Sequence, residues 1–252
     1  MFYLVLFIFS VSLTFFVKHY TKKKNILDIP NFRSSHTTPT PKGGGFAIMF
    51  TFYVGVAYLY FISEIDQKLF LLLLSSVPIM IMGLIDDIIV LEWKTRIFIQ
   101  TTCSILAVYI LGGVQSIDFI LFELNGWGLN LFAILSILWF INLFNFLDGI
   151  DGYAGSQAVI AGFGSYLIMN NLVGLLIAVT SLGFLVFNWP KALIFMGDVG
   201  STTLGFLFAV LCFYDTSSGN IYVWLIVLSF FWFDATYTII KRYINKEQIT
   251  VP

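Results

Sequence analysis

The sequence predicts an all-α protein, a polytopic bundle of transmembrane helices. Of its 252 residues, 59% are hydrophobic and only 11% are charged, and its mean hydropathy is +0.92, outside the usual range of soluble domains. The apolar segments are apolar around the whole helix, whereas the helices of a large soluble core would each show one polar face. Residues 1–252 are therefore expected to form a single integral membrane domain.

Nine segments are candidates for membrane spans, because a helix crosses the hydrocarbon layer in about 20 residues. They are 1–17, 44–62, 69–85, 97–112, 129–146, 153–169, 172–187, 202–214 and 221–240. The segment 202–214 is short and the break at 169–172 is only "MNNL", so a count of eight or ten stays open.

The basic residues indicate the orientation of these spans. With nine spans, one set of loops holds all but one of the thirteen Lys and Arg residues, and the other set holds only Lys68. Since cytoplasmic loops carry an excess of basic residues, we expect a multi-pass protein of the inner (plasma) membrane. Its N-terminus would lie outside and its C-terminus in the cytoplasm.

Five aspartates fall on the same predicted cytoplasmic side, each at or near the end of a span. They are Asp86, Asp87, Asp148, Asp151 and Asp198. Because lipid offers a carboxylate no partner, these side chains are expected to face one shared cavity.

The first polar stretch, "DIPNFRSSHTTPTPKGGGFAI" at residues 28–48, precedes the second span. Arg33, His36 and Lys42 could bind a phosphate, and the glycines at 43–45 would let backbone N–H groups approach it. The alternative is a solvated basic loop, which is the default for a cytoplasmic loop.

The second stretch, "MGLIDDIIVLEWKTRIFIQ" at residues 82–100, holds an aspartate pair at the end of one span. Adjacent carboxylates repel each other, which raises one pKa unless a cation intervenes. A divalent ion, or Lys94 and Arg96 before the next span, could relieve this repulsion. The alternative is that Asp86 and Asp87 make ordinary cap or loop contacts.

The third stretch, "NLFNFLDGIDG" at residues 142–152, places Asn142, Asn145, Asp148 and Asp151 three residues apart. Residues at this spacing share one face of a helix. A cluster of oxygen ligands without imidazole suits Mg²⁺, which prefers one or two carboxylates together with substrate phosphates. Helix capping would explain one of these residues but not the set.

The fourth stretch, "FMGDVGSTTLGF" at residues 195–206, places Asp198 between two glycines just before a span. A carboxylate here would stand at a helix N-terminus, which attracts anions. The alternative is a Gly-Asp turn in which Ser201 caps the next helix.

Together, the motifs "SSHTTPTPKGGG", "GLIDD", "NLFNFLDGIDGYAG" and "FMGDVGSTTLG" resemble, in order, those of the polyprenyl-phosphate N-acetylhexosamine-1-phosphate transferases (glycosyltransferase family 4). These integral membrane enzymes start bacterial envelope glycan synthesis, and the match runs from about Asp28 to Asp234. The resemblance implies that polyprenyl phosphate, most often undecaprenyl phosphate, attacks the β-phosphate of a UDP-N-acetylhexosamine and that UMP leaves. It also implies Mg²⁺ as cofactor, with Mn²⁺ as a substitute.

The resemblance further implies a role for each residue at a motif position. Asp198 would be the leading metal ligand with Asn145 the second, and the pair Asp86 and Asp87 would orient or deprotonate the lipid phosphate. A base role is open, because a phosphate monoester is already largely ionised near neutral pH. The substrate-binding residues would be Asn142, Asp148 and Asp151 near the nucleotide, Phe195 stacked on uracil, and His36, Lys42, Lys94 and Arg96 against phosphate.

Family members usually continue into a cytoplasmic loop with a histidine motif and further spans. This sequence reaches "EQITVP" where that loop is expected, and its histidines are His19 and His36, so a truncated, catalytically impaired homologue is one alternative. A transporter is another, but it would place its acids near mid-membrane on broken helices. No pattern for nucleic acid is present. The sugar, the polysaccharide pathway and a monomeric or homodimeric state stay open, and membrane lipids are the remaining expected partners.

Overall fold

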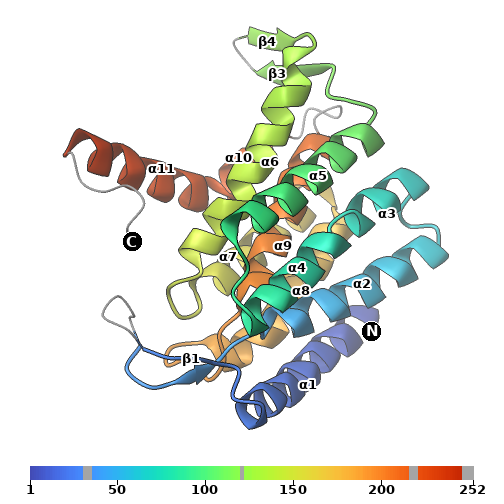
Figure 1. Ribbon diagram of the computed structural model, residues 1–252. Coiled ribbons are helices and arrows are strands. Elements are labelled where there is room, and N and C mark those ends of the chain that lie inside the picture. Colours follow the sequence, from blue (N-terminus) through green and yellow to red (C-terminus); the bar gives the residue numbers. More distant parts are fainter. Residues whose placement is uncertain (31–35, 120–121, 216–220, 246–252) are drawn as a thin grey trace.

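The computed structural model describes residues 1–30, 36–119, 122–215 and 221–245, which form a helical bundle with two small pairs of strands (Figure 1). The helices are α1 (Phe2–Lys23), α2 (Gly45–Phe61), α3 (Gln67–Leu74), α4 (Val77–Ile88), α5 (Trp93–Ile110), α6 (Gly128–Leu147), α7 (Tyr153–Met169), α8 (Leu172–Asn188), α9 (Asp198–Tyr214), α10 (Ile221–Val227) and α11 (Ser229–Ile244). Each of the nine apolar segments predicted from the sequence lies on one helix or on two consecutive helices. The all-α fold class is therefore confirmed.

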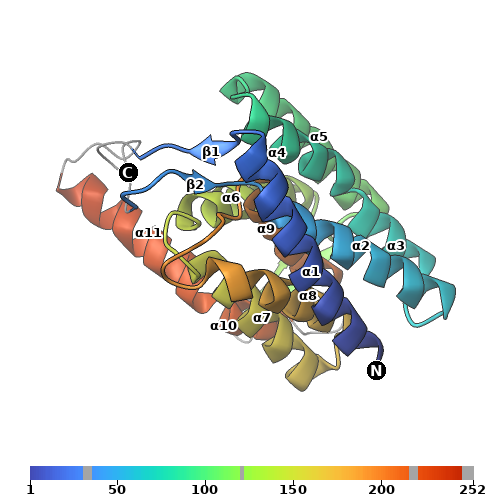
Figure 2. The same ribbon diagram turned by 90° about the horizontal axis from the view of Figure 1, so that it is seen from below.

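Two pairs of antiparallel strands lie at opposite ends of the bundle. β1 (Leu27–Asp28) pairs with β2 (Thr40–Pro41), with Leu27 opposite Pro41. At the other end, β3 (Ser116–Phe119) pairs with β4 (Phe122–Asn125) in a hairpin. Seen from below, β1 and β2 lie across the end of the bundle at which α1 ends and α9 begins (Figure 2).

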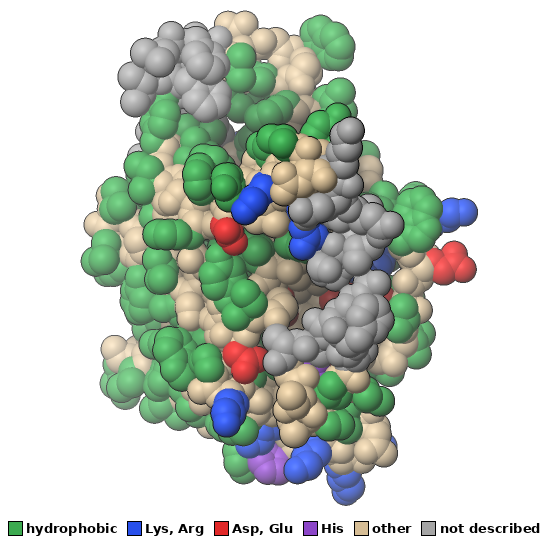
Figure 3. Space-filling model, turned by 90° about the vertical axis from the view of Figure 1, so that its left-hand side faces the viewer, with side chains coloured by type: hydrophobic (Ala, Val, Ile, Leu, Met, Phe, Trp, Pro, Cys, Tyr) green, Lys and Arg blue, Asp and Glu red, His purple; other side chains and the backbone are tan. Residues whose placement is uncertain are grey.

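Three of the described helical stretches are long and apolar enough to cross a membrane. They are α1, the stretch Gln67–Ile88 that comprises α3 and α4, and α6, and a fourth is added if α10 and α11, bent by 64°, form one span. Large hydrophobic side chains are exposed on the outer faces of the helices, among them Phe16, Phe98 and Leu131. Figure 3 shows many hydrophobic side chains on one face, interspersed with other residues, and the largest group of Lys and Arg at its lower edge. The count of nine spans and their orientation stay predictions.

Helix α9 is the centre of the bundle, because every residue from Val199 to Leu211 is buried. It packs against α2, α4 and α6, and at each of these contacts a glycine lets the two backbones approach closely. A Cβ atom on Gly45 of α2 would lie 2.3 Å from the Cα of Gly200, and one on Gly83 of α4 would lie 2.6 Å from the carbonyl carbon of Asp198. Small residues at helix contacts are the usual means of close packing in membranes. The packing of α9 thereby fixes the position of Asp198.

Three helices have one end at a position that differs from the sequence prediction. α1 extends to Lys23, so two lysines lie in its last turn, where the helix dipole favours cations. α5 begins at Trp93, four residues earlier than predicted, which places Lys94 and Arg96 on the helix and not before it. α9 begins at Asp198 and not at residue 202, because a side chain from α4 supplies its cap.

Candidate active site

The start of α9 is held by a carboxylate from another helix. Asp87, at the end of α4, accepts hydrogen bonds from the backbone N–H of Asp198 at 3.0 Å and of Val199 at 3.2 Å. The next two N–H groups, of Gly200 and Ser201, donate to the carbonyl oxygen of Gly197. The N–H groups of the first four helical residues, Asp198 to Ser201, therefore all have acceptors. This N-terminus presents the side chain of Asp198, not free N–H groups, to a ligand.

Gly197 is required for this arrangement. Its φ is +75°, in the left-handed region that side chains disfavour. A Cβ atom there would lie 2.5 Å from both carboxylate oxygens of Asp87. Glycine thus lets Asp87 reach the helix start.

Asp198 is the point at which residues from α5 and α6 meet α9. Its Oδ1 accepts a hydrogen bond of 2.8 Å from the Asn145 side-chain amide, which also donates to the Ser201 hydroxyl at 3.0 Å. Its Oδ2 lies 2.8 Å from Nη2 of Arg96. Asn145 and Arg96, which lie 53 and 102 positions before Asp198 in the sequence, therefore converge on its carboxylate.

The Oδ2 atom of Asp198 is buried and accepts no hydrogen bond from any residue that the structure describes. The nearby Arg96 nitrogen forms an ion pair with it, but its N–H groups are not aligned for a hydrogen bond. A buried polar atom normally has a hydrogen-bond partner, so this oxygen has the character of a ligand atom. A hard cation such as Mg²⁺, which prefers carboxylate oxygens, fits it.

Arg96 also contacts Asp86, so that Asp86, Arg96, Asn145 and Asp198 form one polar cluster. Its Nη1 lies 3.6 Å from Oδ2 of Asp86, whose Oδ1 accepts a hydrogen bond from the N–H of Leu91 at 2.8 Å. The two carboxylates of the pair thus have different partners. Asp86 faces the Arg96 guanidinium, and Asp87 faces the start of α9.

Asp148 follows the last residue of α6, and its carboxyl interacts electrostatically with Asp198 and Asp87. Burial raises the pKa of its carboxyl well above the usual range, and the charges of Asp198 and Asp87 raise the pKa further, while the backbone N–H of Gly197 opposes the shift. Among the described residues, however, no three His, Cys, Asp or Glu side chains are grouped closely enough to hold a metal ion by themselves. A metal here would need ligands from a substrate as well.

Asn142 and Asp151, the other two residues expected on this helix face, have hydrogen-bond partners outside the cluster. The side-chain amide of Asn142 donates to Gln100 on α5 at 3.2 Å and to the carbonyl of Leu138 at 2.8 Å. Asp151 accepts a hydrogen bond of 2.9 Å from the N–H of Ala192. Asp151 lies apart because α6 ends at Leu147, so the helical spacing of three does not continue to residue 151.

Asn188 ties the loop after α6 to the loop before α9. Its side-chain oxygen accepts from the N–H of Gly152 at 3.0 Å, and its nitrogen donates to the carbonyl of Ile194 at 2.9 Å. Asn188 is not among the residues predicted from the sequence. The signal was present, since Asn188 is the only polar residue in the segment from Gly183 to Pro190 and membrane-embedded polar residues are usually functional or structural necessities.

Gly44 and Gly45, at the start of α2, connect the polar stretch 28–48 with the stretch 195–206. Gly44 and Gly45 donate to the carbonyls of Phe195 and Met196 at 2.9 and 2.8 Å, so these two glycines bind a backbone segment of the same chain. The ring of Phe195 meets His36 edge-to-face, with centroids 4.9 Å apart. His36 and Phe195, both predicted to bind substrate, therefore lie together beside the cluster.

The three remaining predicted phosphate contacts have different surroundings. Lys42 lines a pocket together with Asp87. Lys94 is exposed and its Nζ lies 5.9 Å from the centre of the Trp93 ring. Arg33 lies outside the described residues.

Similarity to known proteins agrees with this geometry. Residues 69–215 match the family model described as Glycosyl transferase family 4. A probable undecaprenyl-phosphate N-acetylglucosaminyl 1-phosphate transferase of Bacillus subtilis is 30% identical over 255 residues, which cover 94% of this chain and 69% of that protein. An undecaprenyl-phosphate alpha-N-acetylglucosaminyl 1-phosphate transferase of Thermotoga maritima is 27% identical over 242 residues, covering 95% of this chain and 74% of that protein.

A relative with a different sugar in its name is also similar. A phospho-N-acetylmuramoyl-pentapeptide-transferase of Kosmotoga olearia is 30% identical over 203 residues, covering 72% of this chain and 61% of that protein. The helical bundle and its acidic cluster are thus those of a membrane enzyme that transfers phosphate-linked sugars. The chain belongs to glycosyl transferase family 4.

Proposed function

We propose that this enzyme transfers an N-acetylhexosamine-1-phosphate from a UDP-sugar to a polyprenyl phosphate and releases UMP. In this reaction an oxygen of the lipid phosphate attacks the β-phosphorus of the UDP-sugar. The bond from that phosphorus to the oxygen bridging to the α-phosphorus breaks, and UMP leaves with this oxygen. The product, a polyprenyl-diphosphate sugar, would start the synthesis of an envelope polysaccharide.

The observation that carries the proposal is the carboxylate of Asp198 at the start of α9. It is fixed by the packing of α9, it has a buried oxygen without a hydrogen-bond donor among the described residues, and a guanidinium lies beside it. Phosphoryl transfer between two anions depends mainly on positioning and on neutralising charge. Asp198 and Arg96 supply a metal ligand and a fixed cation at one point.

The cluster residues then take distinct roles in the proposed reaction. Asp87 is a positioning residue, because both of its oxygens hold the backbone of α9. Asn145 orients the Asp198 carboxylate by its hydrogen bond of 2.8 Å. Arg96 stabilises negative charge on the transferred phosphate, and Asp86 keeps the guanidinium in place.

Mg²⁺ is the cofactor that fits these residues, with Asp198 as its protein ligand. Turning the Asn145 side chain would offer its amide oxygen as a second ligand, since amide oxygens are also ligands for hard cations. When bound, the ion would neutralise charge on the diphosphate and polarise its oxygens. Asp148, with its raised pKa, lies where the positive charge of the ion would favour its ionised form.

The nucleotide would approach from the end of the bundle at which β1 and β2 lie, which the basic residues predict to be cytoplasmic. Phe195 and His36 offer aromatic faces for uracil beside the cluster. N-acetylglucosamine is the first sugar to test, because the relatives from Bacillus and Thermotoga carry it in their names. The proposed topology remains nine spans, with the N-terminus outside.

The test is release of UMP by purified protein from several UDP-N-acetylhexosamines, given undecaprenyl phosphate and Mg²⁺. We expect UMP and a lipid-linked sugar in equal amounts, and no turnover by Asp198→Asn. Asp215→Asn, at the opposite end of the same helix, is the control and should keep most of the activity. Well-folded protein that releases no UMP from any of these donors would contradict the proposal and favour an inactive homologue.

A further inference from the structure

Helix α1 ends in a row of lysines. Lys18 and Lys22 lie one turn apart on the helix, and Lys23 follows in its last turn. Among the described residues, no carboxylate forms a salt bridge with any of the three. The helix dipole favours cations in the last turn, which accounts for Lys22 and Lys23. It does not account for Lys18, which lies before that turn.

The ammonium group of Lys18 is held between aromatic rings of two helices. Its Nζ lies 5.5 Å from the centre of the Phe15 ring on α1 and 5.0 Å from the centre of the Phe187 ring on α8. The face of an aromatic ring attracts a cation, but it carries no net charge that would neutralise one. The rings therefore fix the position of the ammonium group and leave its positive charge available to an anion.

The surroundings of Lys18 place it at the boundary between hydrocarbon and water. Trp189 follows Phe187 by two residues and is 63% exposed, and tryptophan is enriched at membrane interfaces. On the other side of Lys18, the exposed side chains of Ile8 and Phe15 lie seven residues apart and so share one helix face. An apolar strip on α1 thus leads to fixed positive charge at the level of the lipid headgroups.

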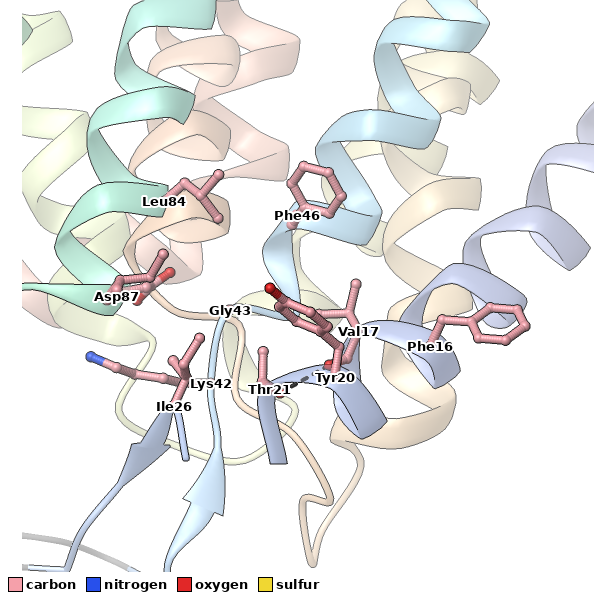
Figure 4. Close-up of a pocket in the computed structure, with 11 residues that line it drawn as sticks. Phe16, Val17, Tyr20, Thr21, Ile26, Lys42, Gly43, Phe46, Leu84 and Asp87 are labelled. Carbon is pink, nitrogen blue, oxygen red and sulfur yellow. Dashed lines mark hydrogen bonds between the residues drawn. The ribbon is translucent and has the colours of Figure 1, made fainter. Parts of the chain in front are cut away.

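This face of α1 is separate from the pocket between α1, α2 and α4. Figure 4 shows Val17 and Tyr20 of α1 beside that pocket, whereas Phe15, Lys18 and Lys22 do not line it. The lysine row instead lies on the face of α1 that meets the end of α8. A ligand on this face would not occupy the proposed reacting site.

We propose that this face, formed by Ile8, Phe15, Lys18 and Lys22 of α1 and by Phe187 of α8, binds a phospholipid of net negative charge. The phosphate would lie at the Nζ atoms of Lys18 and Lys22, and an acyl chain would follow Phe15 and Ile8 into the bilayer. A basic row directly after an apolar helix is typical of sites for anionic lipid. A zwitterionic headgroup fits less well, because it would bring a second ammonium group close to the lysines. The inference does not depend on the proposed reaction.

The first experiment is photolabelling of the protein in phosphatidylcholine nanodiscs by phosphatidylglycerol that carries a diazirine on its headgroup. We expect labelled peptides from residues 15–23 and from the end of α8, and protection by unlabelled phosphatidylglycerol at constant total lipid. Replacing it with more phosphatidylcholine should protect poorly. Equal protection by the two phospholipids, stronger protection by undecaprenyl phosphate than by phosphatidylglycerol, or labels confined to other helices would each overturn the proposal.

The second experiment measures phosphatidylglycerol binding to the protein in neutral detergent by native mass spectrometry. Lys18→Met should weaken binding about fivefold, as expected for one lysine beside an anionic lipid. Lys18→Arg should bind nearly as the unaltered protein, because arginine keeps the charge and also stacks on aromatic rings. Lys68→Met is the control with the same change of charge, since Lys68 is exposed on α3. Equal losses in Lys18→Met and Lys68→Met would overturn the proposal.

Added salt gives a further check on the ionic contact. Because exposed charges are screened by salt, we expect raised NaCl to weaken the binding of phosphatidylglycerol to the unaltered protein more than its binding to Lys18→Met. The same salt dependence in both proteins would contradict a contact between Lys18 and the lipid phosphate. Thermal unfolding of each variant in the same detergent shows that the fold is intact.

Discussion

Asp87 and Asp198 are joined by a hydrogen bond of 3.0 Å in which the carboxylate of Asp87 accepts the backbone N–H of Asp198. The bond links the end of α4 to the start of α9 and is reinforced by a second, from Val199. The second aspartate of the pair therefore has a role in placing a helix. A role as general base, which the family resemblance allows, would compete with these two backbone hydrogen bonds.

Removing the Asp87 cap should lower both stability and activity, whereas removing a comparable cap elsewhere should lower stability alone. Asp87→Ala leaves two N–H groups at the start of α9 without an acceptor, at a cost of about 1–2 kcal/mol in the free energy of unfolding. Asp66→Ala removes the comparable cap of α3, a bond of 2.7 Å from the N–H of Leu69. Both variants should unfold at similarly lower temperatures in detergent, and only Asp87→Ala should lose turnover. Equal turnover would argue against a positioning role for Asp87.

Arg96 and Lys94 should differ in their effect on turnover, although the sequence predicts that both bind phosphate. Arg96 bridges Asp86 and Asp198 at 3.6 and 2.8 Å, whereas Lys94 contacts the Trp93 ring at the surface. Arg96→Met should lower kcat for UMP release about 100-fold, in line with the loss of a charge-stabilising group, and Arg96→Lys should recover little of it because the two-pronged contact is lost. Lys94→Met should have a clearly smaller effect. The reverse order would contradict the geometry.

The contact between α2 and α9 should tolerate no added methyl group. A Cβ atom on Gly45 would lie 2.3 Å from the Cα of Gly200, so Gly45→Ala should lower the free energy of unfolding by about 1–3 kcal/mol through overpacking. Gly128→Ala is the control, since a Cβ there meets no atom within 4 Å. Thermal unfolding of both variants in the same detergent measures the difference. An unchanged unfolding temperature for Gly45→Ala would show that the helices separate easily.

The raised pKa of Asp148 predicts a pH dependence of stability. An unfolded aspartate titrates near pH 4, and because the folded pKa is higher, folding favours the protonated form. The contribution of this group is therefore neutral below about pH 4 and becomes destabilising as the pH rises toward the folded pKa. Asp148→Asn should gain unfolding temperature relative to the unaltered protein between acidic and neutral pH, measured in EDTA. A constant difference across that range would mean that the group does not titrate as inferred.

The sequence was sufficient to predict the helical bundle and most of the acidic cluster. Apolar length and composition identified each segment that forms a helix, because these features depend on the local sequence. The carboxylates of separate helix ends were expected to share one cavity, since they need shared partners in lipid. Asp87 and Asp198 come from two such ends and lie together, whereas Asp151 contacts Ala192. Arg96, Asn145 and Asp198 do meet.

The contacts within the cluster could not be predicted from local patterns. Whether Asp86 or Asp87 caps α9 depends on the rotation of α4, which is set by the contact of Gly83 with Asp198. The end of α6 at Leu147 separates Asp151 from the site, and a spacing of three residues contains no information on where a helix stops. The pocket that Lys42 and Asp87 line, between α1, α2 and α4, is likewise a product of tertiary packing.

The most direct test of the proposed reaction follows the β-phosphorus of the donor. Purified protein is given undecaprenyl phosphate, Mg²⁺ and UDP-N-acetylglucosamine labelled with ³²P at the β-position. We predict that the label moves into the lipid phase and that the released UMP is unlabelled. Labelled UDP in the aqueous phase would show transfer of the sugar without its phosphate, and this result would contradict the account.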